Sequence, residues 1–374
     1  MPRGKTVFPM ILVCVAAGAA SPPAKGLGFA GQFSLSLAGH ARKAVDPLGA
    51  ARYLPEFTFE KTLAGGRSLT MDFAANIFGS VRCSPGGGRE ASGRAKNYRS
   101  WIRFSTSQLE ARLGLQKINF GSAVLLRPLM WFDLLDPRDP LQITDGVWGL
   151  LIKYTFLNNS SIWAWGLYGN DRAKGWETLP TAPRTVEFGG RFQTPVPSGE
   201  LGLTFHHRRM AISPAPAAPE NRFAVDGKWD IGVGIWMEAA IHHYDSRLLL
   251  NKYQQALTIG LDYTFGIGGG LHVLGEHFIL ESSAKAFARG EGLRVSALSL
   301  NYPLGLLDTL TGILYYDWKN SRFYRFVNWQ RKYDRWSFHV IGFWNPDEFD
   351  IYRTPGGENL FAGGGFQIMA VFNH

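Results

Sequence analysis

The chain of 374 residues contains only two cysteines, Cys14 and Cys83. Cys14 lies in an N-terminal segment that we expect to be removed, so Cys83 stands alone. A single cysteine excludes an intrachain disulfide and a thiol-based zinc or redox site. Beyond residue 20 no window holds eighteen consecutive apolar residues, so the sequence offers no segment that would cross a bilayer as a helix.

Organised catalytic or metal-binding groups are also missing. The pairs His206-His207 and His242-His243 cannot each bind one metal ion, because neighbours on a strand point to opposite faces. The run Gly266–Gly270 lacks the lysine and helix of a phosphate-binding loop. Serines and histidines occur without the spacing of a nucleophile and its base. We therefore expect no enzyme, no metal and no cofactor, and keep an outer-membrane enzyme as the least favoured alternative.

The first twenty residues resemble a secretory signal peptide. Arg3 and Lys5 precede an apolar run, Val7 to Ala17, and small residues follow at Gly18–Ala20. This order of charge, apolar core and small residues is typical of a cleaved export signal. The sequence predicts a signal peptide over 1–20 and one mature domain over 21–374.

Alternation is what the rest of the chain has in abundance. From Gly28 to Phe372, segments of about ten residues alternate apolar side chains with small or polar ones. Hydrophobic residues make up 45% and aromatic residues 14% of the chain, and the mean hydropathy is only −0.08. A transmembrane β-strand needs an apolar residue only at every second position, so this composition fits an all-β transmembrane antiparallel β-barrel. A soluble β-sandwich of this length would need an interdomain linker, which the pattern lacks.

Eighteen strands can be predicted, with sixteen as the alternative if the weakest hairpin, at 221–226, is dropped. The first three centre on Phe33, Phe57 and Phe73. The others are expected at about 97–105, 108–118, 147–156, 160–168, 184–193, 200–208, 221–226, 228–243, 253–265, 270–280, 293–302, 309–318, 323–332, 335–344 and 363–372.

Connection lengths alternate between long and short along the predicted strands. Long polar connections include Arg82 to Lys96, Asn119 to Gly146 and Arg209 to Glu220. Short connections include Leu63 to Arg67 and Asp226-Gly227, the latter a strong hairpin-turn signal. Bacterial barrels have long extracellular loops and short periplasmic turns, so this alternation predicts that both termini lie in the periplasm.

Two motifs resemble porin-like outer-membrane barrels related to alginate-export proteins. The first runs Arg112-Leu-Gly-Leu-Gln116-Lys-Ile-Asn-Phe120-Gly121 and continues in Asp133-Leu-Leu-Asp136-Pro137-Arg-Asp139; the second spans Asp226 to Glu238. The motifs cover about a sixth of the chain. The resemblance implies a barrel with a transport role and does not specify a substrate.

The partners follow from the same features. Phe366, Ile368, Ala370 and Phe372 form an alternating last strand, similar to the signal read by the outer-membrane assembly machinery, although Asn373 and His374 follow it. The formal net charge of +9 favours anionic solutes or lipid headgroups, and export argues against nucleic acid. We expect contact with the lipid bilayer and lipopolysaccharide in the outer membrane of a Gram-negative bacterium, and the oligomeric state stays open.

Charged residues in the inward phase of the strands are candidates for lining a pore. A charge facing lipid at mid-membrane costs about 2–4 kcal/mol for Arg or Lys, so these side chains should face the lumen. An open channel is favoured over a plugged barrel because eighteen strands enclose more space than side chains fill. The candidates are basic Arg103, Arg112, Lys153 and Arg191, and acidic Glu110, Glu187 and Glu238.

The connection from Asn119 to Gly146 is rich in bulky apolar residues, which water would solvate poorly. It is therefore predicted to fold into the lumen and form a constriction; a cap on the outer rim is the alternative. Facing the basic wall, four carboxylates would then create a transverse field. They are Asp133, Asp136, Asp139 and Asp145.

The sequence as a whole predicts an outer-membrane porin-like channel. It would pass small hydrophilic or anionic solutes by diffusion, or export an acidic polysaccharide. A structural, complex-forming barrel of an envelope assembly is the alternative from another class; its lumen would be plugged or filled by a partner.

Overall fold

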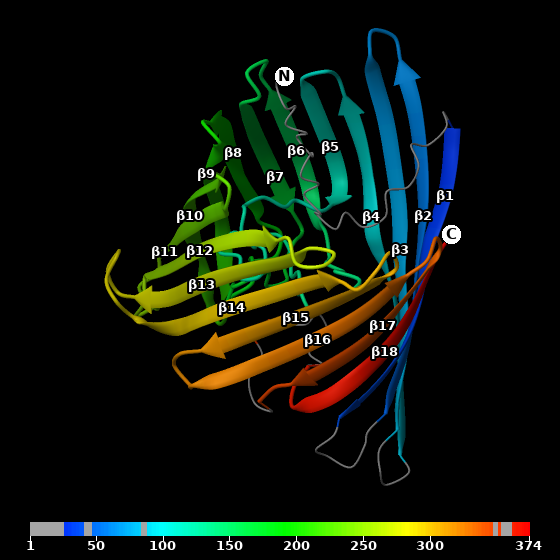
Figure 1. Ribbon diagram of the computed structural model, residues 1–374. Coiled ribbons are helices and arrows are strands. Elements are labelled where there is room, and N and C mark those ends of the chain that lie inside the picture. Colours follow the sequence, from blue (N-terminus) through cyan, green and yellow to red (C-terminus); the bar gives the residue numbers. More distant parts are fainter. Residues whose placement is uncertain (1–25, 41–46, 84–87, 347–350, 353–360) are drawn as a thin grey trace, which may run out of the picture.

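The computed structural model describes residues 26–40, 47–83, 88–346, 351–352 and 361–374. The predicted signal peptide lies outside these residues. Within them no helix is long and apolar enough to cross a membrane. Eighteen strands form one sheet (Figure 1). They are β1 (Gly26–His40), β2 (Leu48–Leu63), β3 (Arg67–Cys83), β4 (Arg89–Ser105), β5 (Leu109–Gln116), β6 (Val147–Thr155), β7 (Ser161–Tyr168), β8 (Val186–Val196), β9 (Gly199–Ile212), β10 (Ala215–Asp230), β11 (Gly234–Tyr244), β12 (Tyr253–Phe265), β13 (Leu271–Ser283), β14 (Glu291–Pro303), β15 (Asp308–Asp317), β16 (Arg322–Lys332), β17 (Trp336–Trp344) and β18 (Gly364–Asn373).

The sheet closes on itself. Each strand pairs antiparallel with its sequence neighbours, and β1 also pairs with β18, from Gln32 opposite Asn373 to His40 opposite Gly365. Backbone hydrogen bonds in both directions between Gly31 and His374 complete the seam. The predicted eighteen-stranded antiparallel barrel is confirmed.

Alternation along each strand separates an outer from an inner face. In β13, Glu276 and Phe278 are buried inside the barrel, whereas His277 between them is exposed outside. Large apolar side chains cover the outer face; Phe73, Leu203 and Ile368 are each at least half exposed. Such a continuous apolar surface would be unfavourable in water and is suited to lipid.

Short turns lie at one end of the barrel, together with the start of β1 and the end of β18. Four of these turns span residues 64–66, 106–108, 231–233 and 333–335. The longest connections, 117–146, 169–185 and 345–363, lie at the opposite end. Two of the predicted long connections are wrong: strands β3 and β4 extend to Cys83 and from Arg89, and β9 meets β10 across 213–214.

The predicted hairpin turn at Asp226-Gly227 is also wrong, because both residues lie inside β10 and the turn comes at 231–233. Asp226 points inward, where it forms an ion pair with Arg191. Gly227 leaves room for the Trp229 ring, since a Cβ there would come within 2.6 Å of it. The strand count survives because the hairpin is displaced and not lost.

Candidate pore and its inserted loop

The connection between β5 and β6, residues 117–146, is here called the inserted loop. Figure 1 shows this teal segment crossing the interior of the ring of strands. Its bulky side chains are buried; Leu126 is 0% and Trp131 2% exposed. The loop therefore folds into the lumen, as its apolar composition predicts, and does not cap the rim.

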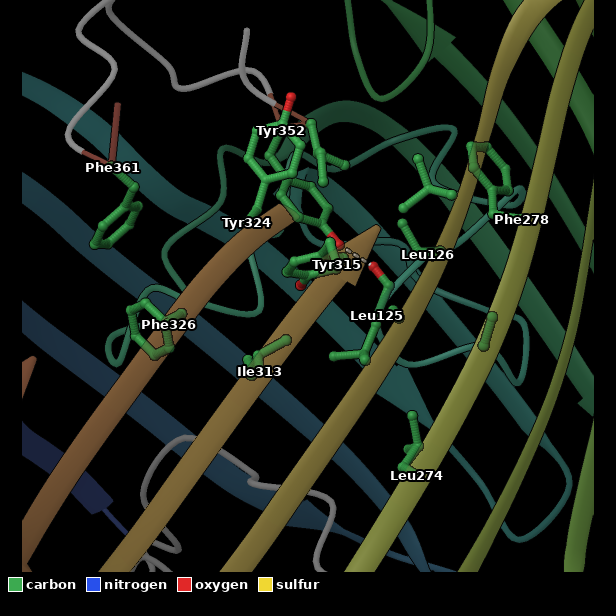
Figure 2. Close-up of a cluster of buried hydrophobic side chains, with 14 of the residues drawn as sticks. Leu125, Leu126, Leu274, Phe278, Ile313, Tyr315, Tyr324, Phe326, Tyr352 and Phe361 are labelled. Carbon is green, nitrogen blue, oxygen red and sulfur yellow. Dashed lines mark hydrogen bonds between the residues drawn. The ribbon is translucent and has the colours of Figure 1, made fainter. Parts of the chain in front are cut away.

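An apolar inner wall receives the loop. The inward side chains of β11 to β17, which would contact water in an open barrel, are largely hydrophobic and pack against Leu125 and Leu126 (Figure 2). Burial of these facing surfaces stabilises the loop position by the hydrophobic effect. The wall residues are Trp236, Ala256, Leu274, Phe278, Val295, Ala297, Ile313, Tyr315, Tyr324, Phe326, Ile341 and Phe343.

Two carboxylates of the wall hold the backbone of the loop. Glu276 accepts hydrogen bonds from the amides of residues 124, 125 and 126 at 2.7, 2.9 and 2.6 Å. Glu238 accepts from the amides of residues 123 and 129 at 2.7 and 3.2 Å. The Thr258 hydroxyl donates to the Leu126 carbonyl at 2.5 Å. These contacts satisfy loop amides that have no strand partner, so they fix the loop in one register.

The last long connection, 345–363, also reaches this cluster. The Tyr352 hydroxyl donates to the Leu125 carbonyl at 2.5 Å, and the Tyr352 ring contacts that of Tyr315 (Figure 2). Arg138 of the inserted loop lies over the rings of Tyr352 and Phe361. Two loops therefore cover the β11–β17 side of the lumen together.

Beside the loop, ion pairs fill the interior of β8 to β10. Arg191 forms a bidentate pair with Asp226 at 2.5 and 2.8 Å, and both side chains are nearly fully buried. Glu187 contacts His206 and Lys174, each at 3.2 Å. Burial of a charge requires such partners, because an unpaired one would be strongly destabilising.

A second buried network joins β9 and β10 to the β7–β8 connection. Arg208 and Arg222 each contact both Glu220 and Glu177, at 2.5 to 3.1 Å. Glu177 comes from the 169–185 connection, so this segment is also held inside the barrel. These residues were not predicted from the sequence. Arg208, Glu220 and Arg222 stand at alternating positions that face the lumen, and this alternation could have identified them.

Open space remains on the opposite side of the lumen. A cavity of about 1140 Å³ lies between the inserted loop and the inner face of β1 to β4. Small polar side chains from β1, β3 and β4 line it, among them Ser34, Ser36, Asn76, Ser80 and Ser92. Cations also reach it from β2, β4 and the β7–β8 connection: Arg52, Arg94, Lys96, Arg172 and Lys174.

The four aspartates predicted for the constriction all line this cavity. Asp133 pairs with Arg127 at 3.0 Å and Asp136 with Arg138 at 2.8 Å, both within the loop. Asp145 contacts Lys96 on β4 and Arg172. Asp139 accepts hydrogen bonds from the amides of residues 141 and 143, and burial raises its pKa.

Those aspartates do not face the basic residues that the sequence analysis assigned to them. Arg112 pairs with Glu110 at 2.7 Å, and Arg103 lies 4.0 Å from the same carboxylate. Lys153 lies 4.5 Å from the centre of the Trp163 ring. Arg103, Glu110, Arg112 and Lys153 are partly exposed inside the barrel. They lie near the short turns and are not part of the cavity lining.

Three other candidates point inward but are covered. Arg191 is 4% exposed, and Glu187 and Glu238 are 0% exposed. Their charges are used in ion pairs or in holding the inserted loop. Alternation along a strand assigns each of these residues to the inner face of the barrel. It does not show which part of the lumen the loops cover.

Comparison with known proteins gives the fold. No family model and no curated protein matches the chain. Solved structures are similar: OccD3 of Pseudomonas aeruginosa at 11% identity (TM-score 0.56, 93% of this chain and 91% of that one) and OccAB4 of Acinetobacter baumannii at 9% (0.56, 93% and 98%). OmpT of Vibrio cholerae, an outer membrane protein in its trimer form, shares 12% identity (0.51, 93% and 99%).

The closed strand order and these similarities define the fold as that of an outer-membrane porin-type β-barrel. Identities of 9–12% assign the fold alone and leave the solute open. A relation to alginate-export proteins, which the sequence motifs suggested, is not shown.

Proposed function

We propose that this protein is a passive outer-membrane channel for small hydrophilic solutes, with a preference for anions. The observation that carries the proposal is the cavity beside the inserted loop, whose lining carries hydroxyl, amide and charged groups among apolar ones. The loop is held on one wall and leaves a cavity beside β1 to β4, in the half of the barrel next to the long connections, with serine, asparagine and charged side chains in its lining. Such a lining replaces part of the hydration of a polar solute.

The proposed preference for anions rests on which of the charged side chains in the cavity lining are neutralised by ion pairs. Asp133 and Asp136 are paired with arginines of the same loop. Arg52 and Arg94 line the cavity, and within the part of the chain that the structure describes neither has a carboxylate at ion-pair distance. They outnumber the one exposed lining carboxylate that likewise has no ion pair there, Asp171. Fixed charge in a narrow passage acts over roughly a Debye length of 8–10 Å, so these cations should attract anions into it.

The basic net charge also allows an acidic polysaccharide as cargo, an alternative that the resemblance of the sequence motifs raised. We favour small solutes, because a cavity of about 1140 Å³ beside a loop fixed at several points suits molecules of limited size. We propose the Gram-negative outer membrane as the location, on the basis of the apolar outer face and the fold, and propose no catalytic activity.

The experiment is single-channel recording in planar bilayers under a salt gradient. The wild-type channel should conduct, with a reversal potential shifted towards the equilibrium potential of the anion. The double variant Arg52→Glu/Arg94→Glu should move the reversal potential toward cations, while Arg89→Glu on the outer face should leave it unchanged. A folded wild-type barrel without conductance would favour the plugged, structural barrel.

A further inference from the structure

The outer face of β13 to β16 differs from that of β1 and β3 near the end with the long connections. On β1 and β3, outward side chains towards that end are apolar: Leu35, Leu37, Ile77 and Val81 are all exposed. On β14 and β16, outward positions carry Arg294 and Arg325. The first alternates with buried Val295, and the second lies between buried Tyr324 and Phe326, so both guanidinium groups face outward.

Strand register joins these residues into one surface, here called the outer patch: His277, Arg294, Ser296, Tyr316, Trp318, Phe323 and Arg325. Ser296 lies between His277 on β13 and Tyr316 on β15, and Tyr316 is opposite Phe323 on β16. The backbone amide of Trp318 donates to the carbonyl of Arg294 at 3.0 Å. The patch is therefore continuous across four neighbouring strands.

The contacts within the patch leave the Arg325 guanidinium without a carboxylate partner among the described residues. Arg294 pairs with Glu281, and Ser296 Oγ accepts a hydrogen bond from Trp318 Nε1 and bonds His277 Nδ1, both at 2.9 Å. The Arg325 guanidinium lies 5.2 Å from the centre of the Phe323 ring. No carboxylate of the described residues lies at ion-pair distance from Arg325.

Depth along the strands indicates what this cation meets. Arg294 and Arg325 are each the fourth residue of their strand, counted from the end with the long connections. A barrel strand crosses the apolar layer in about 9–11 residues, and β16 has 11. Both arginines therefore lie in the third of the layer next to the long connections, from where a long side chain can extend towards the headgroups. Tyr316 and Trp318 are the aromatic types enriched at the boundary between this layer and the headgroups.

We propose that the outer patch is a binding site for a lipid whose headgroup carries phosphate, in the leaflet next to the long connections. Arginine offers phosphate a planar set of donors, and the patch provides two arginines whose side chains can reach the headgroups. Outward Leu298 and Leu314, beside the patch, provide an apolar surface for the acyl chains. The proposal is independent of solute transport, because the patch lies outside the barrel.

The test is native mass spectrometry of the full-length protein, released from detergent in the presence of a diphosphoryl glycolipid. Wild-type protein should retain this lipid, and retain phosphatidylcholine poorly. Basic residues contribute about 1 kcal/mol each near an anionic headgroup, so Arg294→Gln/Arg325→Gln should bind the diphosphoryl lipid about thirtyfold more weakly. Arg325→Lys should keep most of the binding, and Arg89→Gln on β4 is the matched control.

Folding of each variant is checked by its heat-dependent shift on gels. Unchanged lipid binding in the folded double variant would overturn the proposal, as would an equal loss in Arg89→Gln. If the wild-type protein forms an oligomer without bound lipid, and the double variant dissociates it, the patch is instead an interface between copies of the chain, and the proposal is wrong.

Discussion

Individual charged residues have two different roles in this barrel, and burial separates them. Arg191 and Asp226 belong to the buried framework, whereas Arg52 and Arg94 reach the cavity. Sequence phase placed Arg191 on the inner face but could not predict its partner, because Asp226-Gly227 has the form of a hairpin turn. The register of β10 is set by pairing over its whole length, which local turn propensity does not report.

Removing one partner of the buried Arg191–Asp226 pair should destabilise the barrel. Arg191→Ala leaves Asp226 as an unpaired buried charge, a change that costs about 3–5 kcal/mol in comparable pairs. Urea unfolding in lipid vesicles, followed by tryptophan fluorescence, measures the loss. The double variant Arg191→Met/Asp226→Leu should recover most of it. A single variant as stable as wild type would show that the pair is not buried as described.

Asp139 should make stability depend on pH. Burial raises the pKa of its carboxyl above the ordinary 3.8, so the folded state favours the protonated form. This contribution is complete below the ordinary pKa and is lost as pH rises through the raised one. Asp139→Asn should therefore gain stability relative to wild type as pH increases through that window. Parallel unfolding curves at every pH would contradict this.

At the scale of elements, the sequence predicted that the inserted loop lies in the lumen but did not predict which wall it packs against. The apolar run from Val124 to Leu135 correctly indicated a loop inside the lumen. It could not indicate which wall would receive it, because that depends on the inward side chains of seven strands brought together only by barrel closure. Glu276 illustrates the difficulty, since nothing near it in sequence shows that it binds loop amides.

Glu276 should control the position of the loop. Glu276→Ala removes the acceptor of three loop amides, and hydrogen bonds to charged groups contribute about 1.5–3 kcal/mol each. The loop should then leave the wall part of the time, so single-channel currents should become noisier and the mean conductance higher. Glu276→Gln should have a smaller effect, and Glu200→Ala on β9 should have none. Currents identical to wild type in Glu276→Ala would show that the loop is held by apolar packing alone.

For the whole molecule, strand number and closure could be predicted because alternation is repeated in every strand, so errors at single hairpins do not accumulate. The open part of the lumen could not be predicted in the same way. It is what remains after two loops and the β7–β8 connection occupy the side formed by β8 to β17. Its position beside β1 to β4 is a property of the assembled barrel.

The central claim is that solutes pass between the inserted loop and β1 to β4, and thiol block of single-channel current tests it most directly. In a Cys83→Ser background, Ser36→Cys places a thiol in the cavity lining, and Thr258→Cys places one beneath the loop, where Thr258 is 0% exposed. A bulky methanethiosulfonate reagent should reduce the current through Ser36→Cys channels and leave Thr258→Cys channels unchanged. Current that is insensitive to the reagent in Ser36→Cys, or blocked equally in both variants, would contradict the account.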